Sequence, residues 1–243
     1  MRPFFFLIPL FLSACISQKK HSKSGFARCT IMFYDSITKQ YNKEIIFPDY
    51  SIWYNDNLYI EEIKTVETHR DTTGTITRIT PIAYYLFMDR NSKSFYHYST
   101  FNDTARIIDK YKLPDTAVMK GVGGWPFYRN MELELVSPIN PLADTVINKV
   151  IYGRAQFQIK TNGFLVTAVS YQRCDRKGSV FQFDKNLGKK LGCPITRIDF
   201  LPSLENPMPI SSTIDFIRDS LTNDERKIFN SWEKNIKKYP AYK

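Results

Sequence analysis

Short runs of β-branched and aromatic residues, separated by clusters of turn-forming residues, constrain this fold more than any other feature of the sequence. These residue types suit a pleated, half-buried surface. In the first half of the chain the runs occupy residues 30–35, 51–54, 58–66 and 75–89. Clusters of Asn, Asp, Thr and Gly lie at residues 55–57, 71–74 and 89–92. They predict hairpin turns in an antiparallel meander, while Pro81 predicts an edge position, a bulge or a strand break.

The second half of the chain repeats this pattern. Residues 145–160 predict one strand, and Asn162-Gly163 predicts the turn into a returning strand over residues 164–173. Asn-Gly is favourable there because it tolerates the positive φ angles of a tight hairpin turn. A further strand is expected over residues 196–200.

Helical patterns appear between the two β halves and at the C-terminus. A short helix is predicted over residues 104–111, ahead of an irregular segment. Near the C-terminus, Ile214 and Ile217 fall on one helical side, and Thr222 with Glu225 forms a capping box that opens a helix. The apolar stripe of this helix is Ile228, Phe229, Trp232 and Ile236. C-terminal helices are therefore expected over about residues 212–238, with the stripe in the core.

Composition supports one substantial domain. The 243 residues are 43% hydrophobic and 15% aromatic, which excludes a disordered or collagen-like protein. Thirteen prolines against ten glycines argue against a coiled coil. The sequence thus predicts a mainly β protein, a β-rich α+β fold in which a curved antiparallel sheet or half-barrel carries a C-terminal helical cap.

The N-terminus carries the strongest functional signal. A basic start is followed by an apolar run over residues 4–12, about half the length that crosses a bilayer, which predicts a signal peptide. The run leads into Leu12-Ser13-Ala14-Cys15, which resembles the lipobox of bacterial lipoproteins. The resemblance implies removal of residues 1–14 and lipidation of Cys15. The alternative is an ordinary cleaved signal peptide with an incidental Cys15.

A lipidated Cys15 would anchor the mature chain to a membrane, since each buried acyl methylene contributes about 0.8 kcal/mol. Residues 15–27 are expected to form the lipidated cysteine and a flexible linker, and residues 28–243 a single domain. Ile16, rather than Asp, follows the cysteine. By the sorting rules that the resemblance implies, this favours the outer membrane, facing the periplasm.

The chain is basic, with 34 Lys and Arg against 24 Asp and Glu and a net charge of +10. An exported protein has no routine access to the genome, so nucleic acid is not an expected partner. The basic residues are better suited to an anionic membrane surface or an acidic glycan. The oligomeric state stays open.

The cysteines and histidines give little chemistry. Cys174 and Cys193 lie 19 positions apart, and in an oxidising compartment they either form a disulfide or remain thiols. Cys29 begins an apolar strand and is expected to be a buried thiol. The three histidines lack the spacing of a metal site, and His97 is expected to be a surface or half-buried strand residue.

No motif points to catalysis. The glycine-rich stretch at residues 121–127 lacks the spacing of a nucleotide-binding loop. Its alternative role is a mobile ligand loop that carries Gly121, Gly123, Gly124, Trp125 and Phe127. Glu61 and Glu62 are adjacent on a strand and therefore point to opposite faces, which does not suit paired-carboxylate hydrolysis. We expect neither a metal, a cofactor nor a catalytic residue.

Residues 144–155 (DTVINKVIYGRA) resemble the central segment of the exported GLPGLI-type proteins. Thr145, Ile147 and Ala155 match that segment, and Arg154 stands in place of its lysine. The resemblance implies a β-rich envelope fold related in shape to the curved half-barrels of lipoprotein carriers. It carries over no catalytic residue.

Three functions follow as expectations. The first is a lipid-anchored binding or carrier module for an apolar ligand or a partner protein, with a cavity beneath the C-terminal helices. The second is a structural lipoprotein that docks onto an envelope complex. The third is a hydrolase whose site is assembled from residues distant in sequence.

Overall fold

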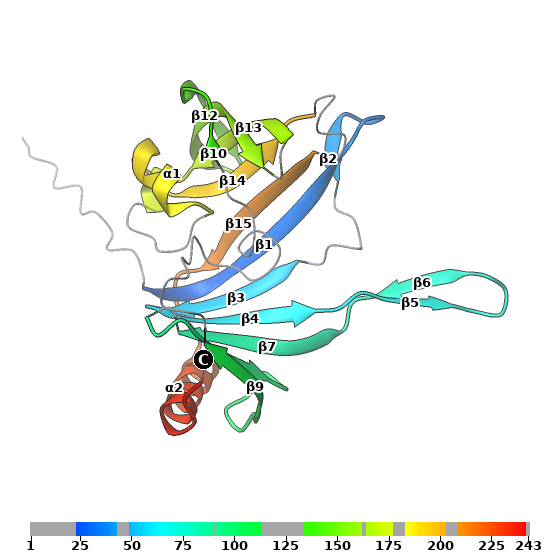
Figure 1. Cartoon of the computed structure of the whole chain (residues 1–243), viewed down its shortest axis with the longest axis vertical. Coiled ribbons are helices and arrows are strands. Elements are labelled where there is room, and N and C mark those ends of the chain that lie inside the picture. Colours follow the sequence, from blue (N-terminus) through cyan, green and yellow to red (C-terminus); the bar gives the residue numbers. More distant parts are fainter. Residues whose placement is uncertain are drawn as a thin grey trace, which may run out of the picture.

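Most of the chain forms one large antiparallel sheet (Figure 1). The computed structural model describes residues 23–42, 49–89, 91–112, 134–161, 164–176, 183–202 and 209–241. Within them, 13 strands follow the order β10-β12-β13-β14-β15-β1-β3-β4-β7-β8-β9, with β11 beside β12 and β2 beside β1. The two ends of this order do not pair, so the sheet stays open. The predicted mainly β fold, with a curved antiparallel sheet and a C-terminal helix, is confirmed.

The strands of this sheet are β1 (Ser24–Asp35), β2 (Gln40–Asn42), β3 (Tyr50–Asn55), β4 (Leu58–Lys64), β7 (Ile82–Asp89), β8 (Ser94–Tyr98), β9 (Ile107–Lys112), β10 (Glu134–Leu135), β11 (Asn140–Ile147), β12 (Val150–Thr161), β13 (Phe164–Gln172), β14 (Ile195–Phe200) and β15 (Ile210–Arg218). A separate ribbon pairs β5 (Glu67–Arg70) with β6 (Ile76–Ile79). The helices are the short 3-10 turn η1 (Cys174–Arg176), α1 (Lys185–Leu191) and α2 (Asn223–Lys238).

The two α-helices lie on opposite faces of the sheet. Side chains alternate along each strand, so each strand contributes to both faces. On one face, here called the α2 face, the stripe of α2 packs against Trp53, Ile60, Phe87, Tyr96 and Tyr98. On the other, the α1 face, Leu187 of α1 packs against Phe157, Ile159 and Val166. The two helices therefore cover different faces of the sheet.

The core beneath α2 is solid. Trp232 is fully buried and stacks on Tyr98 at 3.8 Å between ring centroids, while Phe87 meets it edge-on at 5.8 Å. The Trp232 Nε1–H also donates to the carbonyl oxygen of Asn102. The predicted apolar stripe is therefore confirmed as core. It fills the place beneath the helix where an apolar cavity was expected.

Two predicted helical segments are strands instead. Residues 107–112 form β9, in which Ile107 pairs with Tyr98, and residues 210–218 form β15, between β1 and β14. Ile214 and Ile217 fit a helical spacing, but each of the two segments supplies a partner that the neighbouring strand needs for its backbone hydrogen bonds. The prediction of two C-terminal helices over 212–238 was wrong, since α2 is the single helix described there.

Two strand and linker boundaries also differ from the predictions. Residues 24–27 belong to β1 rather than to the linker, and a Cβ at Gly25 would lie 2.3 Å from the carbonyl oxygen of Arg218. The predicted strand over 145–160 is a hairpin of β11 and β12. Its turn uses Asn148 and Lys149, both with positive φ, as a tight hairpin turn requires. Pro81 does break a strand, between β6 and β7.

Candidate functional site

The α1 face presents a continuous row of apolar side chains across the sheet. The strand register sets Tyr59, Met88 and Phe95 opposite one another on β4, β7 and β8. Ala27 and Ile52 pair with each other in the next row on the same face, on β1 and β3. All five are buried, with exposed fractions from 0% to 7%. They form the floor of an apolar surface that joins the cluster under α1.

The two halves of this face are covered differently. The β12–β14 half lies under α1, whereas no α1 residue packs on the β3–β8 half; Phe183, two residues before α1, contacts both clusters. The other described α-helix, α2, packs on the opposite face. Partly exposed side chains surround the floor of the β3–β8 half: Cys29, Ile63, Tyr84, Tyr111 and Phe216. We call this half, with its floor and its rim, the ligand face.

A few polar groups converge on the ligand face. Glu61, 1% exposed, stands opposite Leu86, and Leu86 stands opposite His97. The His97 ring stacks on Tyr84 at 4.3 Å, and its Nδ1 lies 3.7 Å from an oxygen of Asp109. An apolar surface with a small number of placed polar groups is the usual composition of a small-molecule site.

Cys29 lies at the edge of the ligand face but is not an activated nucleophile. Burial raises the pKa of the Cys29 thiol well above its ordinary value, and the negative charges of Glu61, Asp215 and Asp49 raise it further. A nucleophilic cysteine needs the opposite environment, since the thiolate is the reactive form. Cys29 is a free thiol, as predicted, but the residue is only partly buried.

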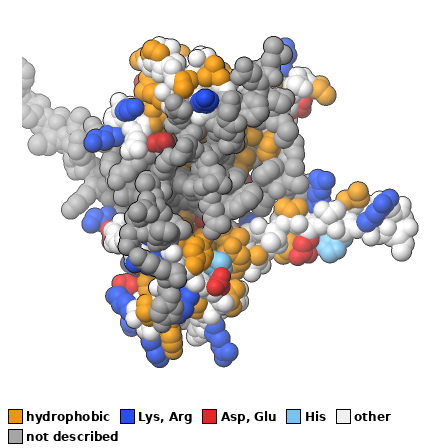
Figure 2. Space-filling model, in the orientation of Figure 1, with side chains coloured by type: hydrophobic (Ala, Val, Ile, Leu, Met, Phe, Trp, Pro, Cys, Tyr) orange, Lys and Arg blue, Asp and Glu red, His pale blue; other side chains and the backbone are white. Residues whose placement is uncertain are grey.

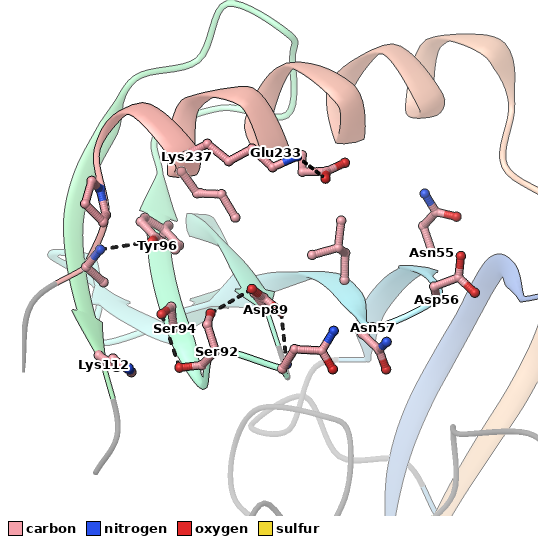
Figure 3. A pocket seen from close by; sticks show the side chains of 15 residues that line it. Asn55, Asp56, Asn57, Asp89, Ser92, Ser94, Tyr96, Lys112, Glu233 and Lys237 are labelled. Carbon is pink, nitrogen blue, oxygen red and sulfur yellow. Dashed lines mark hydrogen bonds and ion pairs between the residues drawn. The ribbon is translucent and has the colours of Figure 1, made fainter. Parts of the chain in front are cut away.

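A second hollow lies at the end of the sheet where β1 begins (Figure 3). It measures about 540 Å³ and lies between α2 and the turns that join β3 to β4 and β7 to β8. Its lining mixes polar side chains with Leu58, Ile236 and Ala241, and its carboxylates are engaged: Asp89 accepts from Ser92 at 2.7 Å, and Glu233 pairs with Lys237 at 2.8 Å. This pocket is separate from the ligand face.

The sequence-predicted site residues have mixed outcomes. Cys174 and Cys193, whose pairing was left open, form a disulfide with 4.8 Å between their Cα atoms. It joins η1 to the start of β14. Cys15 and the glycine-rich residues 121–127 lie outside the described residues.

Within the described ranges, no group of three or more His, Cys, Asp or Glu residues is arranged to hold a metal. Glu61 and Glu62 lie on opposite faces, as predicted: Glu61 is buried on the ligand face, and Glu62 pairs with Lys64.

Sequence reasoning did not find Glu61, Tyr84 or Tyr111 as members of a common surface. One signal was present, because the alternation in LYIEEIK sets Glu61 on the same face as Tyr59 and Ile63. The meeting of β4 with β7, β8 and β9 depends on long-range register, which one strand does not encode.

No family model matches the sequence, and no curated protein matches it significantly. In the described ranges, neither α-helix has the length and apolar character needed to span a bilayer.

Proposed function

We propose that this protein is a lipid-anchored lipoprotein of the bacterial envelope that binds an apolar ligand on the ligand face. The observation that carries the proposal is the apolar floor of β1, β3, β4, β7 and β8, against which neither described α-helix packs and whose rim of Tyr84, Tyr111 and Phe216 is partly exposed. The lipobox resemblance at residues 12–15 supplies the anchor. The open sheet agrees with the half-barrel that the GLPGLI-type resemblance implies.

The ligand face suits an apolar molecule with one polar group. Each square ångström of apolar surface that the ligand removes from water contributes about 25 cal/mol, so the floor supplies affinity. His97 and Glu61 lie within this floor and supply polar contacts for one end of the molecule. The space directly beneath α2 does not offer such a site, because Trp232 and Tyr98 fill it.

Binding is tested with two substitutions on neighbouring residues of β15. Phe216 packs against the cluster of the ligand face, while Ile217 is 49% exposed and lies in the bulge of β15 beside β1. In a form starting at Ser17, Phe216→Glu should weaken binding of a fluorescent fatty-acid analogue by about tenfold or more, because it sets a charge against the apolar ligand. Ile217→Glu should bind like the wild type. Equal affinity in both variants, or no binding by the wild type, would contradict the proposal that an apolar ligand binds on the ligand face.

The anchor is tested separately. Mass spectrometry of the N-terminal peptide should find acyl chains on Cys15, and Cys15→Ala should give a soluble periplasmic form or leave the signal uncut. A membrane-bound acylated protein in the Cys15→Ala variant would contradict the anchor.

Docking onto an envelope complex is a second candidate, favoured by one feature. The β5–β6 ribbon projects from the body of the protein (Figure 1), and every residue of both strands is exposed. Ile76 and Ile79 are 59% and 45% exposed, although a lone two-stranded ribbon is only marginally stable in water. Figure 2 shows the ribbon standing clear with apolar and charged side chains on it. We call it the arm.

Removal of the arm tests this candidate. Replacing residues 67–79 with a short turn should abolish co-purification of envelope partners and leave ligand binding unchanged. A partner set that survives the deletion would argue against docking through the arm.

A further inference from the structure

We infer that the end of the sheet where β1 begins lies against an anionic phospholipid surface, so that the arm points away from the membrane. This inference rests on the proposed acylation of Cys15. It assigns a membrane contact to the folded domain itself, in addition to its lipid.

The start of β1 is fixed at this end by two contacts. The backbone N–H of Asp56 donates to the carbonyl oxygen of Lys23 at 2.6 Å, and the Lys23 ammonium lies 3.5 Å from the Asp56 carboxylate. Asp56 belongs to the β3–β4 turn, which lines the polar pocket. The chain therefore joins the domain beside that pocket.

Lysines gather around the same pocket. Lys112 and Lys237 line it, and the last two turns of α2 also expose Lys234 and Lys238. Figure 3 shows Lys237 and Lys112 on two sides of the hollow, and Figure 2 shows basic side chains around α2. The pocket itself is lined by three carboxylates, Asp56, Asp89 and Glu233, and by two lysines; Lys23, Lys234 and Lys238 beyond its lining bring the lysines to five, here called the lysine end. Two of the carboxylates are paired with members of the lysine end, Lys23 and Lys237.

The length of the tether keeps the lysine end near the bilayer. Eight residues lead from Cys15 to Lys23, and fully extended they span at most about 27 Å. A membrane whose phosphates are negatively charged attracts nearby lysines. Each lysine near the surface raises the equilibrium constant for membrane contact by about fivefold. The opposite end of the sheet lies farther from Cys15, because the 12 residues of β1, which end at Asp35, separate the two ends.

The same geometry directs the arm. Ser24 of β1 pairs with Asn55, and Asn55 pairs with Leu58 at the start of β4. The arm follows the far end of β4, beyond Lys64. A domain that rests on its lysine end therefore extends the arm into the space away from the bilayer, as its place opposite the start of β1 in Figure 1 illustrates.

Amine footprinting of the full acylated chain in vesicles tests the inference. Acetylation followed by mass spectrometry should show Lys112, Lys234 and Lys237 protected by about threefold or more in vesicles that contain phosphatidylglycerol. The protection should be weaker in pure phosphatidylcholine and should fall with added salt, since salt screens surface charges. Lys39 and Lys160, exposed at the other end of β1 and β12, should react equally in both vesicles.

A matched pair of variants separates the lysine end from net charge. Lys234→Gln, Lys237→Gln and Lys238→Gln together should remove the protection of Lys112, whereas Lys39→Gln, Arg70→Gln and Lys160→Gln should leave it intact. Equal reactivity at both ends of an acylated, vesicle-bound wild type would overturn this inference and leave the proposed anchor standing. A Cys15 that carries no acyl chain would overturn the anchor itself, and this inference with it.

Discussion

Glu225 joins three separate segments through one buried carboxylate. Its side chain accepts from Trp53 Nε1 of β3 at 2.7 Å, from Arg218 of β15 at 2.6 Å and from the backbone N–H of Thr222 at 2.7 Å. Burial alone would raise the pKa of Glu225, but these hydrogen bonds outweigh it and lower the pKa below its usual value of 4.5. One residue thus serves both as a helix cap and as a link between α2 and the sheet.

The lowered pKa predicts an acid-dependent loss of stability. Because the unfolded chain takes up the Glu225 proton more readily, the stabilisation is fully present above about pH 4.5 and is lost as the pH falls through the lower folded pKa. At pH 7, Glu225→Gln should lower the free energy of unfolding by about 1–3 kcal/mol, and this difference should shrink below pH 4.5. Urea denaturation of both proteins at several pH values measures it. A difference that is constant with pH would show that the charge is not what matters.

The disulfide is the second residue-scale feature with a measurable effect. It closes a loop of sequence separation 19 around α1. Loop entropy predicts that Cys174→Ser with Cys193→Ser lowers the free energy of unfolding by about 3 kcal/mol. Denaturation of the double variant, compared with the oxidised wild type, gives the value. Stabilities of the oxidised and reduced wild type that do not differ would contradict the prediction.

At the scale of elements, α2 was predictable because its signals are local. The capping box of Thr222 and Glu225 and the stripe through Trp232 both lie within the helix, and both appear in the structure. The β9 and β15 strands were misread because their residues also fit a helical spacing, and the neighbours that pair with them are far away in sequence. The helix α1 was missed, although Asp184 caps its start and Gly192, with φ of 79°, ends it.

The cap of α2 makes a direct prediction for this element. Thr222→Ala removes the hydroxyl that accepts from the backbone N–H of Glu225. The free energy of unfolding should fall by about 1 kcal/mol, as is usual for an N-cap. Thr222→Ser is the control and should recover most of the loss in a urea titration. A Ser variant as unstable as the Ala variant would mean that the threonine methyl group, rather than the cap, is important.

At the scale of the whole molecule, the sequence predicts the β-rich sheet but not the surface that it builds. Cys29, Glu61 and His97 come from three strands, and the register that sets them on one face of the sheet is a long-range property. The anchor signal at residues 12–15 is local and could be read directly. The lysine end and the arm lie at opposite ends of β4. Their positions depend on the direction of β4 in the complete topology, so the sequence alone does not predict them.

The central claim is that an apolar ligand occupies the ligand face, and photolabelling tests it most directly. A photoactivatable fatty-acid analogue should attach to peptides that carry the rim residues Ile63, Tyr84, Tyr111 and Phe216. An excess of unlabelled fatty acid should suppress this labelling. Label found instead on the exposed residues Ile108 and Tyr239 beside α2, or on the arm alone, would contradict the account.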